Sequence, residues 1–251
     1  MESPKLNVQN LDFFYGKNQV LHKINLGVHA HTVTALMGHS GSGKSTLIRT
    51  FNRIYELSPG SLSVGEIHFA GLQILDSQTD LFSLRRRIGM VFQKPTPFPM
   101  SIFDNIAFGV ALYEKLSKPE MASRVTWALE KAGLWTEVKD KLAASSLALS
   151  QGQQQRLCIA RTIAIKPEVL LLDEPTASLD PLSTSTIEDL ILELKNEYTI
   201  VLVTHNLKQA KRIADITAHM HHGEIITCGP TSLVFSNPDH PITKKYIEFA
   251  D

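Results

Sequence analysis

The sequence is poor in cysteine and has no excess of charge of either sign. Its only two cysteines, Cys158 and Cys228, lie far apart in the chain. Such thiols suit a reduced cytosolic protein better than the disulfide framework of a small secreted domain. Lysine and arginine together number 25, and so do aspartate and glutamate, so the formal net charge is zero. Charge therefore gives no argument for binding to nucleic acid or to an anionic membrane surface.

Long apolar runs are missing too. The longest, such as VLLL from Val169 and IVLV from Ile200, are far shorter than the roughly 20 residues that an apolar helix needs to cross a bilayer. The first ten residues, MESPKLNVQN, contain no apolar segment, so we expect no secretory signal. A chain of 251 residues, 43% of them hydrophobic, is nonetheless long and apolar enough to bury a full core.

The order of the apolar patterns predicts an α/β fold. Alternating apolar and polar residues in the first third of the chain predict short strands at 5–16, 23–31 and 65–71. Two later apolar runs without alternation, at 169–173 and 198–203, are typical of strands buried on both faces of a parallel sheet. The remaining patterns predict helices at 187–195 and 207–213 and a hairpin that turns at Gly223.

The middle of the chain has a different pattern. Three prolines within 94–100 exclude a helix there and favour an extended segment. Ser101 then precedes Asp104 by three residues, much like a capping box at the start of a helix. Further helical patterns follow at 118–132 and 134–142. We expect one domain spanning 1–251, with a helical subdomain inserted at about 94–161.

A glycine-rich stretch early in the chain indicates phosphate binding. GHSGSGKST fits the pattern G-x-x-x-x-G-K-[ST], with a predicted strand before it and a helix after it. Its glycines let backbone N–H groups cradle phosphates, Lys44 reaches the β- and γ-phosphates, and the Ser45 hydroxyl binds Mg²⁺. A glycine-rich turn that matches by chance is the alternative, which the flanking strand and helix disfavour. The predicted nucleotide-binding residues here are Gly38, His39, Ser40, Gly41, Ser42, Gly43, Lys44, Ser45 and Thr46.

Polar side chains follow the two buried strands. Asp173 ends the first strand, where ligands bind in α/β sheets, and we expect it to hold the Mg²⁺. Glu174 follows directly and is placed to orient or activate a water molecule, although it could be a solvated carboxylate. His205 lies at the end of the second strand, and this position favours a functional histidine over a structural one.

The stretch LALSQGQQQRLCIAR begins a helix on an unusual polar sequence. Ser150 and Gln153 have the spacing of a reciprocal capping box, so the helix is expected to begin there. Gly152 has no Cβ, so a ligand can approach the backbone closely, and free N–H groups at a helix N-terminus bind anions. A second phosphate-binding element makes sense if it closes over a nucleotide held by another copy of the chain.

Together these motifs resemble those of the ATP-binding cassette (ABC) ATPases over essentially the whole chain. GHSGSGKST is similar to their Walker A motif, VLLLDE to Walker B and LSQGQ to their signature motif. The resemblance implies a P-loop ATPase core with a mainly parallel sheet, an N-terminal antiparallel β portion and an inserted helical subdomain. It assigns catalytic roles to four residues, Gln93, Glu174, Asp180 and His205. It further implies adenine stacking on Tyr15 and Mg²⁺ ligation by Ser45, Gln93 and Asp173.

The resemblance also implies partners. In this family two cassettes meet head to tail and sandwich two ATP molecules, so Ser150, Gly152 and Gln153 would act on the nucleotide of the other chain. RIGMVFQKPTPFPMSIFDNIAFG and the QQQRLCIAR run are similar to the ATP-binding subunit of bacterial inorganic-phosphate importers. Such a subunit works on the cytoplasmic face of the inner membrane as a homodimer, with two membrane permease subunits and an extracytoplasmic solute-binding protein. No residue here recognises phosphate as cargo, because cargo does not touch this subunit.

Three positions depart from the family pattern. Gln151 stands where the signature usually has glycine, Ala177-Ser178 replaces the commoner Ser-Ala, and His39 stands where proline is usual. Gly152, to which we assign the close approach, is retained.

The sequence disfavours three other functions. A cassette ATPase of chromosome maintenance or repair would carry long coiled coils, and no heptad run is present. A GTP-binding switch would need an Asn-Lys pair to read guanine, and none occurs. A binding module without activity is disfavoured because Glu174 and His205 are retained. An importer for a solute other than phosphate stays open.

Three minor features are expected to be structural or to bind a partner. The arginines at 85–87 could contact lipid headgroups, but a solvated face is favoured. His219, His221 and His222 have metal-ligand chemistry without a matching acidic or cysteine partner, so a polar hairpin turn is expected. Phenylalanines 98, 103 and 108 either belong to the core of the insertion or dock a partner helix.

Overall fold

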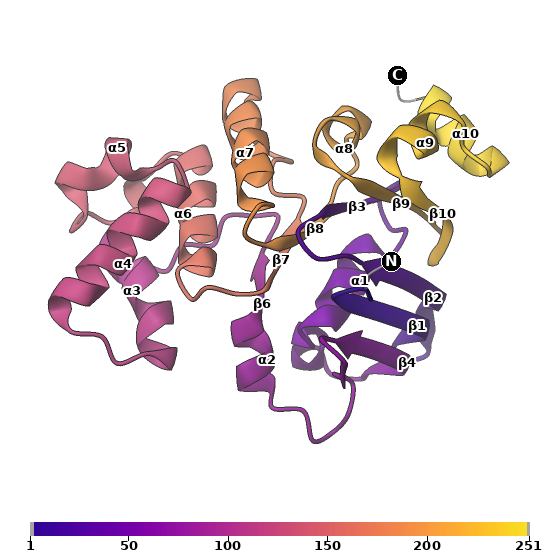
Figure 1. Cartoon of the computed structure of the whole chain (residues 1–251), viewed down its shortest axis with the longest axis horizontal. Coiled ribbons are helices and arrows are strands. Elements are labelled where there is room, and N and C mark those ends of the chain that lie inside the picture. Colours follow the sequence, from indigo (N-terminus) through magenta and orange to yellow (C-terminus); the bar gives the residue numbers. More distant parts are fainter. Residues whose placement is uncertain (1–2, 250–251) are drawn as a thin grey trace.

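The computed structural model describes residues 3–249 and contains two β-sheets with helices around them (Figure 1). One sheet is antiparallel, with strand order β2-β1-β4-β5, and the other has six strands in the order β10-β9-β3-β8-β7-β6. The antiparallel strands are β1 (Leu6–Tyr15), β2 (Asn18–Val28), β4 (Ser61–Phe69) and β5 (Leu72–Gln73). The other sheet consists of β3 (Val33–Met37), β6 (Ile88–Val91), β7 (Val169–Asp173), β8 (Thr199–Val203), β9 (Ile216–His221) and β10 (Glu224–Pro230).

The six-stranded sheet is mostly parallel, as predicted. Strands β9, β3, β8, β7 and β6 pair in parallel, and only the β9–β10 hairpin adds an antiparallel edge. Every residue of β3, β7 and β8 is buried, which explains why their sequences show continuous apolar runs. The N-terminal sheet is antiparallel throughout, and β1 and β2 form its first hairpin. The predicted fold class is therefore confirmed.

Helices pack on both faces of the six-stranded sheet. The helices are α1 (Lys44–Phe51), α2 (Leu81–Arg87), α3 (Ile102–Tyr113), α4 (Lys118–Lys131), α5 (Trp135–Val138), α6 (Gln151–Ile163), α7 (Pro181–Leu194), α8 (Leu207–Ile213), α9 (Thr231–Ser236) and α10 (Pro241–Glu248). Because side chains alternate along a strand, β7 contributes to two cores. Val169 and Leu171 pack in the core that contains α1 and the antiparallel sheet, whereas Leu170 and Leu172 pack with α6 and α7.

The region predicted as a helical insertion, residues 94–161, holds α3, α4, α5 and most of α6. These helices gather at one end of the molecule, away from the antiparallel sheet (Figure 1). Helix α6 continues to Ile163, two residues past the predicted boundary, and its later turns pack on the sheet core. The helix predicted at 134–142 is instead the short α5 followed by a 3₁₀ turn at 139–141.

Several elements were not predicted from the sequence. These are β5, β6 and the helices α2, α9 and α10. Helix α2 carries the three arginines at its end, where they complement the helix dipole. Among residues 3–249, no helix is both long and apolar enough to span a membrane.

Candidate active site

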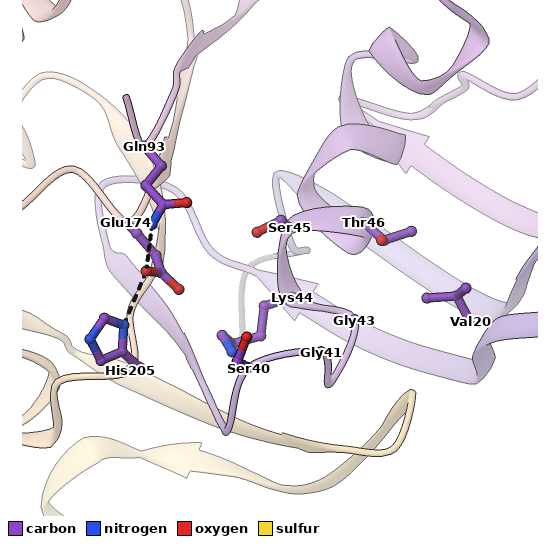
Figure 2. Close-up of a pocket in the computed structure, with 10 residues that line it drawn as sticks. All are labelled: Val20, Ser40, Gly41, Gly43, Lys44, Ser45, Thr46, Gln93, Glu174 and His205. Carbon is purple, nitrogen blue, oxygen red and sulfur yellow. Dashed lines mark hydrogen bonds and ion pairs between the residues drawn. The ribbon is translucent and has the colours of Figure 1, made fainter. Parts of the chain in front are cut away.

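A cavity of about 570 Å³ opens at the carboxyl ends of the parallel strands (Figure 2). The loop between β3 and α1 forms one wall, and the residues that follow β6, β7 and β8 form the other. Strand ends of a parallel sheet are where α/β proteins bind ligands. Its lining consists of Val20, Ser40, Gly41, Gly43, Lys44, Ser45, Thr46, Gln93, Glu174 and His205.

The phosphate loop depends on glycine at two positions. Gly38 has φ 147°, and a Cβ there would lie 2.2 Å from the carbonyl oxygen of Met220 on β9. Gly43, which begins α1, has φ 100°, and a Cβ there would lie 2.8 Å from the Leu21 side chain. Any other residue would have to displace its neighbours and adopt a strained backbone. The predicted Gly-rich loop is therefore formed, and its N–H groups lie at the start of α1.

Lys44 lies at the base of this loop with only 4% of its surface exposed. Its Nζ donates hydrogen bonds of 2.8 Å to the carbonyl oxygens of Gly38 and His39. Burial lowers the pKa of Lys44, while the carboxylates of Glu174 and Asp173 act in the opposite direction. Phosphate oxygens of a bound nucleotide would supply the negative charge that this buried ammonium needs.

Ser45 and Asp173 form the pair predicted to hold Mg²⁺. The Ser45 hydroxyl donates a 2.6 Å hydrogen bond to Asp173 Oδ1, and Arg49 lies 3.4 Å from Oδ2. Asp173 is 2% exposed, and its burial raises its pKa, while the bond from Ser45 and the charge of Arg49 lower it. A hydroxyl and a carboxylate oxygen are ligands that Mg²⁺ prefers, so this donor set fits the ion.

Glu174 is held between two side chains across the cavity from the phosphate loop (Figure 2). Its Oε2 accepts a 3.3 Å hydrogen bond from Gln93 Nε2 and lies 3.0 Å from His205 Nδ1. Both contacts use Oε2, so Oε1 has no hydrogen bond among the described residues. The Glu174 backbone has φ 46°, an uncommon conformation for a non-glycine residue that costs free energy and is frequent at active sites. The arrangement presents a carboxylate oxygen to the cavity for a water molecule.

The signature residues begin α6 but do not line the cavity of the described chain. Ser150 and Gln153 form the predicted capping box: Ser150 Oγ accepts from the Gln153 N–H at 3.3 Å, and Gln153 Oε1 accepts from the Ser150 N–H at 3.0 Å. Gly152 is buried rather than open, because Ser183 of α7 covers it. The close approach of a nucleotide to Gly152 was predicted for a second copy of the chain, and it stays a prediction. Asp180 also lies outside the lining and caps α7 by accepting from the N–H groups of Leu182 and Ser183.

Tyr15 and His39 were both predicted to bind the nucleotide, but neither lines the cavity in the described chain. The Tyr15 ring packs edge-on against Phe13, with 4.9 Å between ring centroids, and does not line the cavity in the described chain. The His39 ring points toward the β9–β10 hairpin, where it contacts His221. Val20 of β2 lines the cavity and was not predicted. In the sequence Val20 is marked only by its place in the strand that follows Tyr15. In the structure this strand, β2, pairs with β1.

Comparisons with known proteins agree on one family. The family model described as "ABC transporter" matches residues 21–177, more than half of the chain and including most of the cavity lining. The chain is similar to cbiO1 from Clostridium perfringens, described as part of the ABC transporter complex cbiONQ. The two share 34% identity over 94% of this chain and 92% of that chain, with a TM-score of 0.82. It is also similar to a bacterial Atm1-family ABC exporter with ATP bound, at 25% identity and a TM-score of 0.82, covering 100% of this chain and 42% of that chain.

Proposed function

Because this chain belongs to the ABC transporter family and carries its ATPase domain, we propose that it powers a bacterial importer whose cargo is inorganic phosphate. The observation that carries the catalytic part is the position of Glu174, which His205 and Gln93 hold across the cavity from Lys44 (Figure 2). A base, its orienting partners and a phosphate-binding loop face a single cavity, as in-line attack of water on a γ-phosphate requires.

Each residue would have a distinct task. Backbone N–H groups of the loop and the Lys44 ammonium bind the nucleotide phosphates. Ser45 and Asp173, together with the Gln93 amide oxygen, would hold Mg²⁺, which neutralises charge on the phosphates when bound. Glu174 accepts a hydrogen bond from the attacking water and orients it, while His205 fixes the Glu174 carboxylate. Ser40 of the loop and Thr46 of α1, which both line the cavity, complete the phosphate contacts.

The active unit would be a head-to-tail homodimer. Ser150, Gly152, Gln153 and Asp180 lie outside the cavity of one described chain, although the signature pattern assigns the first three to nucleotide. The first three begin α6, whose N-terminus favours a bound anion, whereas Asp180 begins α7 and already accepts from the N–H groups of Leu182 and Ser183. A second copy would place these residues over the first copy's ATP, and Tyr15 would then stack on the adenine after a change of rotamer.

The proposal of an importer rests on a sequence resemblance and on an exposed apolar surface. The sequence from 87 to 109 and the QQQRLCIAR run are similar to phosphate importers, and the segment 98–108 exposes apolar side chains that fit a membrane partner. The complex would contain two permease subunits and an extracytoplasmic solute-binding protein, with this chain peripheral on the cytoplasmic face of the inner membrane. An importer for another solute is the second candidate, favoured by the 34% identity with cbiO1 of the cbiONQ complex.

Solute uptake by cells that lack the gene for this protein distinguishes a phosphate importer from an importer of another solute. We expect uptake of radiolabelled phosphate at low phosphate concentration to fall in the deletion strain and to return with the wild-type gene. A gene carrying Lys44→Ala should not restore it. Normal phosphate uptake in the deletion strain, with loss of uptake of a different solute, would instead establish the second candidate.

A further inference from the structure

Three histidines from two separate segments meet beside the phosphate loop. His39 belongs to the loop between β3 and α1, His221 ends β9, and His222 lies in the turn that follows. One ring nitrogen from each lies within 4.8 Å of the others. The ring centroids are 4.3 Å apart for His221 and His222, 5.1 Å for His39 and His221, and 5.3 Å for His39 and His222. Three imidazoles this close form a potential set of metal ligands.

The backbone places these rings together. Gly223 N–H donates a 3.1 Å hydrogen bond to the carbonyl oxygen of Ser42, which ties the hairpin turn to the phosphate loop. The Gly223 carbonyl accepts a 2.9 Å bond from His22 N–H, which fixes the other side of the turn. His222 itself has φ 46°, so the turn depends on a left-handed residue followed by glycine. The main-chain path therefore brings the three histidines to one place beside the phosphate loop.

The His39 ring is already oriented as a ligand. Its Nδ1 lies 2.9 Å from the carbonyl oxygen of Ser40, which can only accept, so Nδ1 carries the proton and donates. In the neutral ring this leaves a lone pair on Nε2, which lies 3.3 Å from His221 Nδ1. Metal-bound histidines typically have this second hydrogen bond to a carbonyl. Zn–N bonds of about 2.0–2.1 Å in tetrahedral geometry separate two ligand nitrogens by about 3.3–3.4 Å. The distance between His39 Nε2 and His221 Nδ1 matches this value, and a nitrogen of His222 lies within 4.8 Å of the other two ligand nitrogens.

His219 does not take part, contrary to the grouping in the sequence. Its ring is fully buried, stacks on Tyr246 at 4.6 Å between centroids and bonds through Nδ1 to Thr243 Oγ1 at 2.9 Å. Its ring lies on the same face of β9 as His221, with 6.4 Å between the ring centroids, but its Nδ1 is bonded to Thr243 and the residue is not part of the cluster. The cluster in the structure therefore contains His39 in place of His219. The sequence of the hairpin alone could not reveal this, because His39 belongs to a distant segment.

We propose that His39, His221 and His222 form a binding site for one divalent transition-metal ion, with Zn²⁺ as the best fit. Imidazole nitrogens suit Zn²⁺, Cu²⁺ and Ni²⁺, whereas Mg²⁺ and Ca²⁺ require oxygen ligands. Three protein ligands leave a fourth tetrahedral position for water. An ion bound here cross-links the loop that holds the nucleotide phosphates to the hairpin turn that supports it. It is separate from the Mg²⁺ site, because neither Ser45 nor Asp173 belongs to the cluster.

Zinc titration of the full-length, tag-free protein tests the site. After treatment with a chelator, Zn²⁺ is added in the presence of excess Mg²⁺ and without nucleotide, and binding is followed by competition with a chromophoric chelator. We expect one Zn²⁺ per chain and a higher melting temperature, because the ion binds only the folded state. Co²⁺ in place of Zn²⁺ should give the visible absorption of a tetrahedral centre.

Two matched variants make the result specific. His222→Asn removes one ligand while asparagine tolerates the left-handed backbone, so we expect Zn²⁺ affinity to fall at least about 10-fold with a normal metal-free melting temperature. His31→Asn changes an exposed histidine with a similar backbone, φ 55°, in the turn before β3 and should leave Zn²⁺ affinity unchanged. Equal Zn²⁺ binding by the wild type and His222→Asn, or no stoichiometric binding by the wild type, would overturn the proposal.

Discussion

A Cβ atom on Gly152 would lie 2.6 Å from the Oγ of Ser183 and 3.0 Å from its Cβ. The signature helix α6 and helix α7 therefore touch at a point where only a hydrogen fits. Ser183 is also held there, because its hydroxyl donates a 2.6 Å hydrogen bond to Asp180 Oδ2. Glycine at 152 is required for packing within one chain, in addition to any contact with a nucleotide held by a second chain.

A double-mutant cycle separates these two requirements. Gly152→Ala should lower the free energy of unfolding by about 1–3 kcal/mol, the usual effect of overpacking. Adding Ser183→Gly removes both clashing atoms, so the double variant should regain most of this loss in a denaturant titration. We expect its ATP hydrolysis to stay low, because the added methyl still blocks the approach to the partner's nucleotide. Recovery of stability and hydrolysis together would show that Gly152 serves helix packing alone.

Gln151, the departure from the signature pattern, should matter little. It is the exposed first residue of α6, and its side chain makes no hydrogen bond within the described part of the chain. Gln151→Gly should change the rate of ATP hydrolysis by less than about tenfold, or about 1.4 kcal/mol in activation free energy. Steady-state hydrolysis by the two proteins at saturating Mg·ATP measures this. A larger change in either direction would place the Gln151 side chain at the nucleotide.

Glu174→Gln should bind ATP normally and hydrolyse it far more slowly. The amide keeps the size and the contacts with Gln93 and His205, but it cannot accept a proton or orient water as a carboxylate does. Loss of a positioned base typically costs about 10²–10⁴-fold in rate. Single-turnover hydrolysis and size-exclusion chromatography with ATP should show a slow enzyme that accumulates as a closed dimer. Glu130→Gln, on the exposed face of α4, is the control and should retain the wild-type rate; a Glu174→Gln rate equal to it would remove Glu174 from the mechanism.

Lys44→Ala should fail at ATP binding, which precedes hydrolysis. Its buried ammonium is the one that the loop presents to the phosphates, and charge-assisted hydrogen bonds are worth about 1.5–3 kcal/mol, or about 10- to 100-fold in affinity. Equilibrium titration with a fluorescent ATP analogue should therefore show weak binding, in contrast to Glu174→Gln. Wild-type affinity in Lys44→Ala would mean that the backbone N–H groups alone bind the phosphates.

The sequence predicted the positions of the loop and strand-end residues better than it predicted the contacts around them. Lys44, Ser45, Asp173 and Glu174 could be placed because each belongs to a short motif whose strand and helix flanks are visible in the pattern. Contacts between distant segments could not be placed from periodicity. The cover of Gly152 by Ser183 joins two helices, and its cause is steric rather than chemical.

The same limit explains the elements that were missed. Strand β6 is only four residues long and is identified by its pairing with β7, which a local pattern does not contain. Helices α9 and α10 are six and eight residues long, too short for a clear period. The histidine cluster needed the β9–β10 turn to be placed against the phosphate loop, and backbone hydrogen bonds between remote residues determine that placement.

The predicted docking surface for a membrane partner is partly revised by the structure. Phe98 and Met100 are each 39% exposed and Phe108 is 45% exposed, whereas Phe103, which was expected beside them, packs against the core. Phe98 and Phe108 contact each other edge-on at 5.5 Å between centroids, and the Arg161 guanidinium lies 4.4 Å from the Phe98 ring centroid.

A shallow cavity of about 370 Å³ adjoins this surface. It is lined by Met100, Asp104, Ala107, Phe108, Ala111 and Met121. Apart from Asp104 its lining is apolar, which fits the helix-in-groove mode of recognition. The backbone beneath is rigid, because Asn105 bonds to both the N–H and the carbonyl of Phe98, so docking should order few residues.

Phe98→Asp should therefore weaken assembly without unfolding the chain. The aspartate places a charge on a surface that the short cytoplasmic helix of a permease would bury, and the desolvation of an unpaired carboxylate opposes binding. We expect normal ATP titration and a melting temperature close to that of the wild type, with loss of co-purification with the membrane subunits. Phe103→Asp is the matched control: it places the same charge against the core, so it should lower the melting temperature markedly. A destabilised Phe98→Asp protein that still assembles would show that Phe98 belongs to the internal packing of the helical region and that the permease docks elsewhere.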